Sequence, residues 1–252
     1  MTDAKTLAYI NLYGILGALE NLCELDEEAS ELAQVKKPVS VGISVKGGPS
    51  ATLTFKNGRC RMEQGTAKCD VLLPFSSCEK FNGLIDGTVT PIPAKGFTKI
   101  GFLLNNFTKL TDILTKFLRP EEKDLEDEVF FEKSTKLMFY LITVAIAQIA
   151  NNDEIGMFSA SNIPDGIVEM SIKNSVSATL RVKNGHIVTI KQKPESYRSK
   201  MEFASIKLAR DLFDGKVNAV ACIGDGSITM SGLVSMIDNV NRILDRVALY
   251  LA

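Results

Sequence analysis

The chain has few of the residues on which catalytic and metal sites are usually built. Its 252 residues include one histidine, His186, and five cysteines that form no C-x-x-C pair. A single imidazole cannot supply a paired-histidine or Cys/His cluster, so we expect no metal site and no cofactor. An odd cysteine count also argues against a disulfide framework. The thiols are instead expected to act mainly as small buried apolar groups.

Strong charge and long apolar runs are lacking as well. The formal net charge is −1, which does not provide the basic field that nucleic acids attract. The longest apolar run, 137–150, is shorter than the roughly 20 residues that span a bilayer. Residues 1–5 lack the basic start of a secretory signal. We therefore expect a cytoplasmic protein that neither binds nucleic acid nor inserts stably into a membrane.

What the chain does have is an internal repeat. The segment ATLTFKNG at 51–58 recurs as ATLRVKNG at 178–185, which is 127 residues later. At this offset 13–58 aligns with 140–185 without a gap and with 16 identities in 46 positions, where average residue frequencies predict about three. Matches continue with small length changes to the last helix of each copy. We predict a first unit at 1–118, a charged linker at 119–128 and a second unit at 129–252.

Each unit predicts the same order of elements. An apolar helical stripe opens it, and alternating strands follow, with type I′ hairpin turns at Asn57-Gly58 and Asn184-Gly185. A helix then ends before Gly87 or Gly215. A further strand is expected near 98–102 and 227–230, and a long amphipathic helix closes each unit. This order indicates an α+β fold in which helices cover one face of an antiparallel-dominated sheet.

These residues resemble the sterol carrier protein family, the lipid-transfer domain of the nonspecific lipid-transfer proteins. The resemblance is carried by ATLRVKNG at 178–185, by MEFASIKLARDLFDGKVN at 201–218 and by GSITMSGL at 226–233. It covers 168–244 well and 41–114 less well. The first copy departs at Thr90-Pro91-Ile92-Pro93, where two prolines disfavour a helical turn and predict a reshaped or closed pocket.

The resemblance implies an apolar tunnel between sheet and helices for fatty acyl, sterol-like or other hydrophobic ligands. The residues expected to line it share apolar helix stripes that are also typical of ordinary cores. They are Leu208, Leu212, Phe213, Met236, Ile237, Val240 and Ile243 in the second unit, and Phe81, Leu84, Ile85, Phe107, Leu110 and Ile113 in the first.

Other functions remain open at this stage. Two fused copies with closed cores would suit an interaction or scaffold protein, with pseudo-symmetric contacts between the units or a homo-oligomer. An enzyme is not expected, because the carboxylates have no recognisable partner. His186 follows a turn, Asp26-Glu27 and Asp153-Glu154 fit solvated turns, and the basic run 191–198 fits a solvated loop.

Overall fold

A computed structural model describes residues 2–251, and it divides into two compact units, Met1–Lys133 and Ser134–Ala252. The predicted boundaries at 118 and 129 stay a prediction. Between them lies a one-turn helix, η5 (Glu122–Glu126), which follows Pro120. Helix α7 (Glu128–Asn152) begins just before the division and belongs mostly to the second unit.

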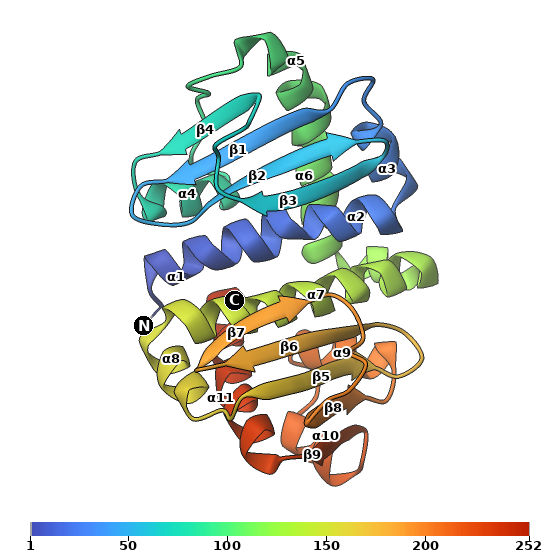
Figure 1. Cartoon of the computed structure of the whole chain (residues 1–252). Helices are drawn as coiled ribbons and strands as arrows, with labels where there is room; N and C mark the ends of the chain where they lie inside the picture. The colour runs from blue at the N-terminus through green and yellow to red at the C-terminus, as the bar shows by residue number, and fades with distance from the viewer. Residues whose placement is uncertain (1, 252) are drawn as a thin grey trace. The chain divides into compact units, whose positions relative to one another are not determined.

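The first unit contains a four-stranded mixed sheet in the order β3-β2-β1-β4 (Figure 1). Strands β1, β2 and β3 form an antiparallel meander, while β4 pairs parallel to β1. The bounds of the strands are β1 (Val39–Val45), β2 (Ser50–Lys56), β3 (Arg59–Gln64) and β4 (Val71–Phe75). Its helical elements are α1 (Ala4–Tyr9), η1 (Ile10–Ile15), η2 (Leu16–Ala18), α2 (Leu19–Leu25), α3 (Glu27–Ala33), α4 (Cys78–Ile85), η3 (Phe97–Lys99), α5 (Ile100–Phe102), η4 (Leu103–Phe107) and α6 (Thr108–Leu118).

The second unit repeats this plan with one more strand, in the order β7-β6-β5-β8-β9. Strand β8 is again parallel to β5, and β9 pairs antiparallel with β8. The elements after α7 are α8 (Glu154–Ser161), β5 (Gly166–Ile172), β6 (Ser177–Lys183), β7 (His186–Ile190), β8 (Ser199–Phe203), α9 (Ile206–Phe213), α10 (Ala219–Gly224), β9 (Ile228–Gly232) and α11 (Val234–Leu251). The predicted α+β class with antiparallel-dominated sheets is confirmed.

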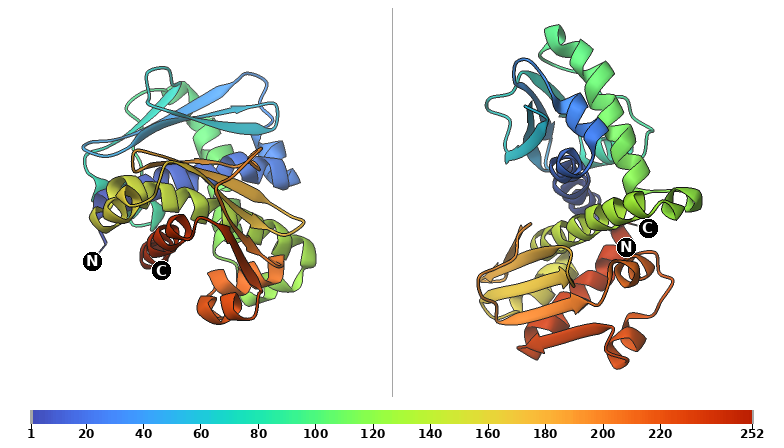
Figure 2. Two further views of the ribbon diagram at one scale, coloured as in Figure 1. Left: turned by 60° about the horizontal axis from the view of Figure 1, so that its bottom comes forward. Right: turned by 90° about the vertical axis from the view of Figure 1, so that its right-hand side faces the viewer.

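One face of each sheet is apolar and covered by helices (Figure 2). Alternate residues of β1 and β5 point to this face, and they are buried. They are Val39, Val41, Ile43 and Val45 in the first unit, and Val168, Met170 and Ile172 in the second. Helices α6 and α11 run along these faces, so the core of each unit lies between its sheet and its last helix.

The repeated hairpin turns have the backbone that the sequence predicts. Asn57 and Asn184 both have φ of 51°, and the glycines that follow have φ of 75° and 73°. Positive φ at both central residues is the requirement of a type I′ turn, which Asn-Gly meets at little steric cost. The prediction of two equivalent hairpins is confirmed.

The crossover from β3 to β4 was not expected from the strand pattern, which predicted antiparallel neighbours. The connecting loop passes over β1 at Gly42, where an added Cβ would lie only 2.7 Å from Sγ of Cys69. A residue without a side chain therefore leaves room for the loop. The equivalent position in the second unit is Glu169, and the loop there, 191–198, is two residues longer than 65–70.

The strand predicted near 98–102 is wrong for the first unit, where η3 and α5 occupy this range. Only a single bridge, Leu72 to Lys95, forms at the free edge of β4. Pro74 stands two residues beyond Leu72 and faces the same edge, where it has no N–H to donate. Pro91 and Pro93 remove two further donors from the approaching segment. In the second unit β9 forms as predicted.

We predict that Gly58→Ala lowers the free energy of unfolding by about 1–2 kcal/mol, because alanine is strained at positive φ and its Cβ would lie 2.7 Å from Oγ of Ser30. Gly47→Ala is the matched control: its φ is 73°, and no atom lies within 4 Å of the added Cβ. Urea unfolding of both variants separates strain from crowding. If both variants lose the same free energy of unfolding, Ser30 moves aside freely and crowding adds nothing to the strain.

Candidate functional site

The predicted lining residues of the second unit fall into two groups. Met236, Ile237, Val240 and Ile243 of α11 are buried, so this helix packs tightly on the sheet. Leu208, Leu212 and Phe213 of α9 are only half-buried. The two helices that would enclose an apolar ligand therefore differ, and the accessible apolar surface belongs to α9.

Helix α9 is held by polar contacts at its ends and on one side. Oγ of Ser205 accepts a hydrogen bond from N of Leu208 and caps its first turn. The Arg210 guanidinium is buried, pairs with Asp214 at 2.9 Å and donates to Oγ of Ser134 at 2.9 Å. These contacts fix the helix without burying its large apolar side chains, since only Ala209 and Arg210 are buried.

The segment after α9 leaves further apolar side chains in contact with solvent. Val220 and Ile223 of α10 are exposed, and so are Leu233 and Val234 at the start of α11. Asn218 caps α10 through a hydrogen bond accepted from N of Ala221. We take the half-buried face of α9, and not these exposed residues, as the candidate site.

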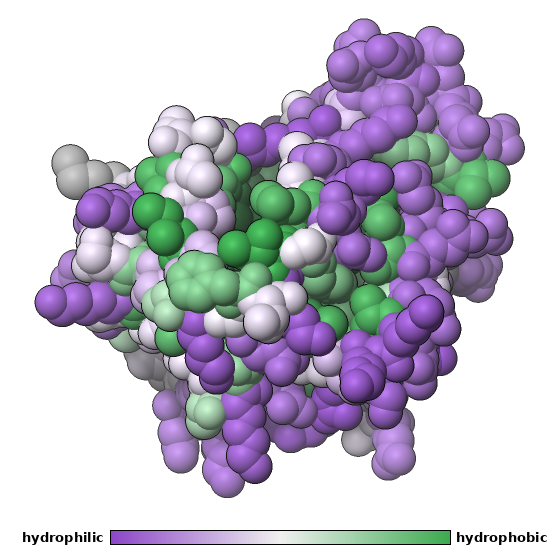
Figure 3. Space-filling model, turned by 90° about the horizontal axis from the view of Figure 1, so that it is seen from above, coloured by the Kyte–Doolittle hydropathy of each residue, from purple (hydrophilic) through white to green (hydrophobic). Residues whose placement is uncertain are grey.

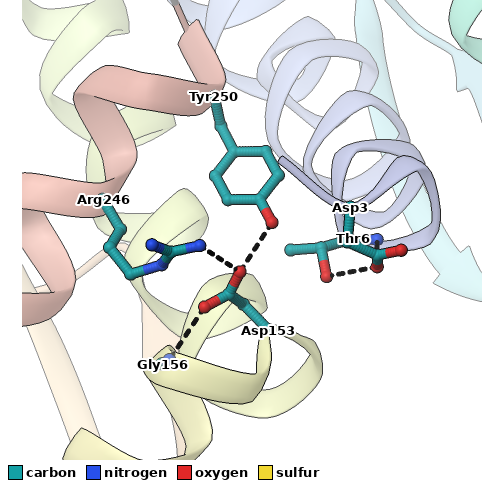
Figure 4. A network of polar contacts seen from close by, with 6 residues as sticks. All are labelled: Asp3, Thr6, Asp153, Gly156, Arg246 and Tyr250. Atoms are coloured by element: carbon teal, nitrogen blue, oxygen red, sulfur yellow. Dashed lines mark hydrogen bonds and ion pairs between the residues drawn. The ribbon is translucent and has the colours of Figure 1, made fainter. Parts of the chain in front are cut away.

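An ion pair with a buried aspartate fixes α11 (Figure 4). The carboxylate of Asp153 accepts hydrogen bonds from Nη2 of Arg246 at 2.6 Å, from the Tyr250 hydroxyl at 2.7 Å and from N of Gly156 at 2.9 Å. Burial raises the pKa of Asp153, but these hydrogen bonds outweigh it and hold the pKa below its usual value. The hydrogen bond with Asp153 likewise raises the pKa of Arg246.

Asp153 is 4% exposed, so the expectation of a solvated turn is wrong for this residue. It caps α8 and at the same time holds the last turns of α11. Its repeat partner Asp26 caps α3 through N of Ala29 and lies 3.4 Å from Nζ of Lys133. The sequence signal was the repeated Asp-Glu, but its partners lie far away in the chain and only the fold brings them together.

In the first unit, the buried ring of Phe55 contacts two half-buried aromatic side chains. The ring of Phe55, on the core face of β2, lies 5.2 Å from that of Phe102 and 6.0 Å from that of Phe107. The repeat places Val182, Gly232 and Ile237 at these positions in the second unit. Larger side chains therefore occupy the space beside the first sheet.

The other residues predicted to line the first pocket are divided in the same way as those of the second. Phe81 and Leu110 are buried, and the ring of Phe81 lies 5.2 Å from that of Phe75. Leu84, Ile85, Phe107 and Ile113 are half-buried. Whether any of these thirteen side chains contacts a ligand stays a prediction.

The opposite face of the second sheet carries a polar cluster that the sequence analysis missed. Glu169 is 1% exposed, and its Oε1 accepts a hydrogen bond from Oγ of Ser177. Nζ of Lys200 lies 2.6 Å from Oε2 of Glu202 and 3.9 Å from Oε1 of Glu169. The hydrogen bond to Lys200 lowers the pKa of Glu202, which keeps this carboxylate ionised rather than poised as an acid near neutral pH.

The remaining candidates behave as ordinary structural residues. His186 is exposed, and its Nδ1 lies 2.6 Å from Oδ1 of Asn151. All five cysteines are buried, and burial raises the pKa of Cys23 to about 12. Within residues 2–251 no group of three or more His, Cys, Asp or Glu side chains could hold a metal ion. Over the same range, no helix combines the length and apolar character needed to cross a membrane.

We predict that Asp153→Asn destabilises the second unit by about 1–3 kcal/mol at pH 7, because it leaves the Arg246 side chain, which is only 12% exposed, without its counter-charge while asparagine can still cap α8. The matched variant Asp26→Asn is expected to cost less than about 1 kcal/mol, since its partner Lys133 is more exposed. Hydrogen exchange of amides in α8 and α11, and in α3, measures each unit separately.

The same ion pair predicts a loss of stability in acid. The pKa of Asp153 is lower in the folded chain, so its contribution is present above the unfolded pKa of about 3.9 and is lost as the pH falls through the folded value. In the parent protein, the hydrogen-exchange protection of the α11 amides should therefore decrease when the pH is lowered below about 4. In Asp153→Asn this protection should depend less on pH. Identical acid profiles would contradict this assignment.

Comparison with known proteins was made at three levels. No family model and no curated protein matches the chain. Among solved structures, a sterol carrier protein domain 2 from Helicoverpa armigera aligns with 45% of this chain and 88% of its own, at 17% identity and a TM-score of 0.35. Sterol carrier protein 2 from Yarrowia lipolytica aligns with 42% and 88%, at 21% identity and a TM-score of 0.33.

A ubiquinone synthesis protein, described as UbiJ-SCP2, aligns with 43% of this chain and 97% of its own. The identity is 15% and the TM-score is 0.34. Each of these structures aligns with less than half of the chain. The chain resembles sterol carrier protein domains, as its sequence pattern predicts.

Proposed function

We propose that this protein binds a lipid or another apolar small molecule, and that the second unit holds it beside α9 and α11. One observation carries the proposal: the large apolar side chains of α9 remain half-buried although the helix is fixed in place. An ordinary amphipathic helix buries such a stripe in the core. The sequence resemblance to sterol carrier domains implies the same class of ligand.

The physical driving force is the removal of apolar surface from water. Each methylene group of an acyl chain contributes about 0.8 kcal/mol when it is buried, so about ten methylenes offset the cost of immobilising the ligand and still leave useful affinity. Such a ligand would cover Leu208, Leu212 and Phe213 at once. It needs no charged partner, because the affinity comes from area rather than from polar chemistry.

The first unit favours a different role. The ring of Phe55, on the core face of β2, contacts those of Phe102 and Phe107 from the segment before α6. We therefore infer that this unit acts mainly as a closed scaffold, which is the alternative that the duplicated sequence left open. Only one ligand per chain is expected.

We predict that a fluorescent fatty acid binds the full chain saturably with a stoichiometry near one. Leu212→Gln should weaken it about 5- to 30-fold, because a polar amide replaces an apolar contact worth about 1–2 kcal/mol. Leu84→Gln, at the repeat position in the first unit, is the matched control. It is also half-buried and should change the affinity less than about twofold.

Native mass spectrometry of the purified chain complements this titration by detecting lipid that has co-purified. Absence of both bound lipid and saturable fluorescence would refute the binding proposal. Equal loss from Leu84→Gln and Leu212→Gln, with a stoichiometry of two, would show instead that both units bind.

A further inference from the structure

The first unit exposes large apolar side chains on the segment that connects α4 to α6. Ile92 is 78% exposed, Phe97 is 66% exposed and Leu104 is 67% exposed. Figure 3 looks onto the side of the first unit where α5 lies, and it shows apolar side chains gathered on this surface. Three such residues within 13 positions form a patch rather than scattered single exposures.

The same segment is basic. Residues 88–111 contain Lys95, Lys99 and Lys109 and no aspartate or glutamate, although the whole chain has a net charge of −1. Helix α3, which contacts η4, carries the exposed acids Glu27, Glu28 and Glu31 and bounds the basic region on that side. Apolar side chains among lysines are the pattern of a surface that enters the headgroup layer of an anionic membrane.

The segment is held to the unit while its apolar residues stay exposed. Gly96 packs so closely on the backbone of Asp70 and Val71 that an added Cβ would lie 2.8 Å from Cα of Val71. Phe102 and Phe107 contact Phe55 in the core. Because these anchors order the segment before it meets a partner, docking requires little further loss of conformational entropy.

We propose that 88–109, here called the basic apolar segment, docks the protein on the surface of an anionic bilayer. Ile92, Phe97 and Leu104 would enter the boundary between headgroups and acyl chains, and the three lysines would lie at the level of the phosphates. The mode is interfacial, with no helix crossing the bilayer. It goes beyond ligand binding, because it assigns a separate surface on the other unit.

The second unit provides an internal comparison. The repeat places Val220 and Val234 at the positions of Ile92 and Leu104, and each is 76% exposed. The corresponding segment 216–239, however, has one lysine and two aspartates, so its net charge is −1. Exposed apolar residues are thus common to both units, while the basic residues that attract an anionic surface occur only in the first.

The test is co-sedimentation of the full chain with phosphatidylcholine vesicles that contain about 30% phosphatidylserine, a composition with a strongly negative surface. The double variant Ile92→Asp/Leu104→Asp should lower partitioning about tenfold or more, because it replaces two inserting side chains with charges. The matched control, Val220→Asp/Val234→Asp, should change it less than about twofold. All four positions are exposed, so both variants should fold.

The lysines are tested separately. Lys95→Gln/Lys99→Gln should lower partitioning onto anionic vesicles about fivefold per residue, since each lysine near such a surface contributes about 1 kcal/mol. Binding should also fall with rising salt and be weak on pure phosphatidylcholine. Fatty-acid binding in solution by these variants should be unchanged, so failure of membrane docking is distinguishable from failure of the proposed ligand site.

Two results would overturn the proposal. The first is a failure of the vesicle test, either because the parent chain does not bind anionic vesicles or because Ile92→Asp/Leu104→Asp and Val220→Asp/Val234→Asp lower vesicle binding equally. The second is a change in molecular mass by light scattering for Ile92→Asp/Leu104→Asp with vesicle binding unchanged, which would assign the patch to contact between copies of the chain.

Discussion

Burial of one apolar sheet face in each unit is the constraint on which the rest of this structure depends. The alternating valines and isoleucines of β1 and the matching residues of β5 must be shielded from water, and a helix must lie over them. The two units meet the constraint with different side chains. In the first unit Phe55 contacts Phe102 and Phe107, whereas the second unit has Val182, Gly232 and Ile237 at these positions. Divergence after duplication thus acted on what fills the core and kept the fold.

Polar contacts show the same divergence. Asp26 and Asp153 occupy one repeat position, and both cap a helix. Only Asp153 also binds an arginine and a tyrosine of the last helix. A conserved local role, the cap, therefore became part of a longer-range contact in one unit. The consequence is a firmly held α11 in the same unit as α9, whose large apolar residues stay half-buried.

Prolines account for the other large difference between the units. Pro74 removes a donor from the free edge of β4, and Pro91 and Pro93 remove two from the segment that would pair there. The fifth strand is lost, and the chain forms short helical turns with exposed apolar residues and three lysines nearby. The segment that stands in place of the fifth strand carries the three lysines of the surface that we assign to membrane docking.

The sequence by itself determined the duplication, the α+β class, the Asn57-Gly58 and Asn184-Gly185 hairpins and the buried stripes of the last helices. These features depend on local periodicity and on backbone preferences of a few residues. Only the tertiary structure decided that β4 and β8 run parallel to β1 and β5, that Asp153 meets Arg246, and that Leu212 stays accessible while Ile243 does not. These outcomes depend on residues far apart in the chain, and an apolar helix stripe looks the same in sequence whether it is covered or open.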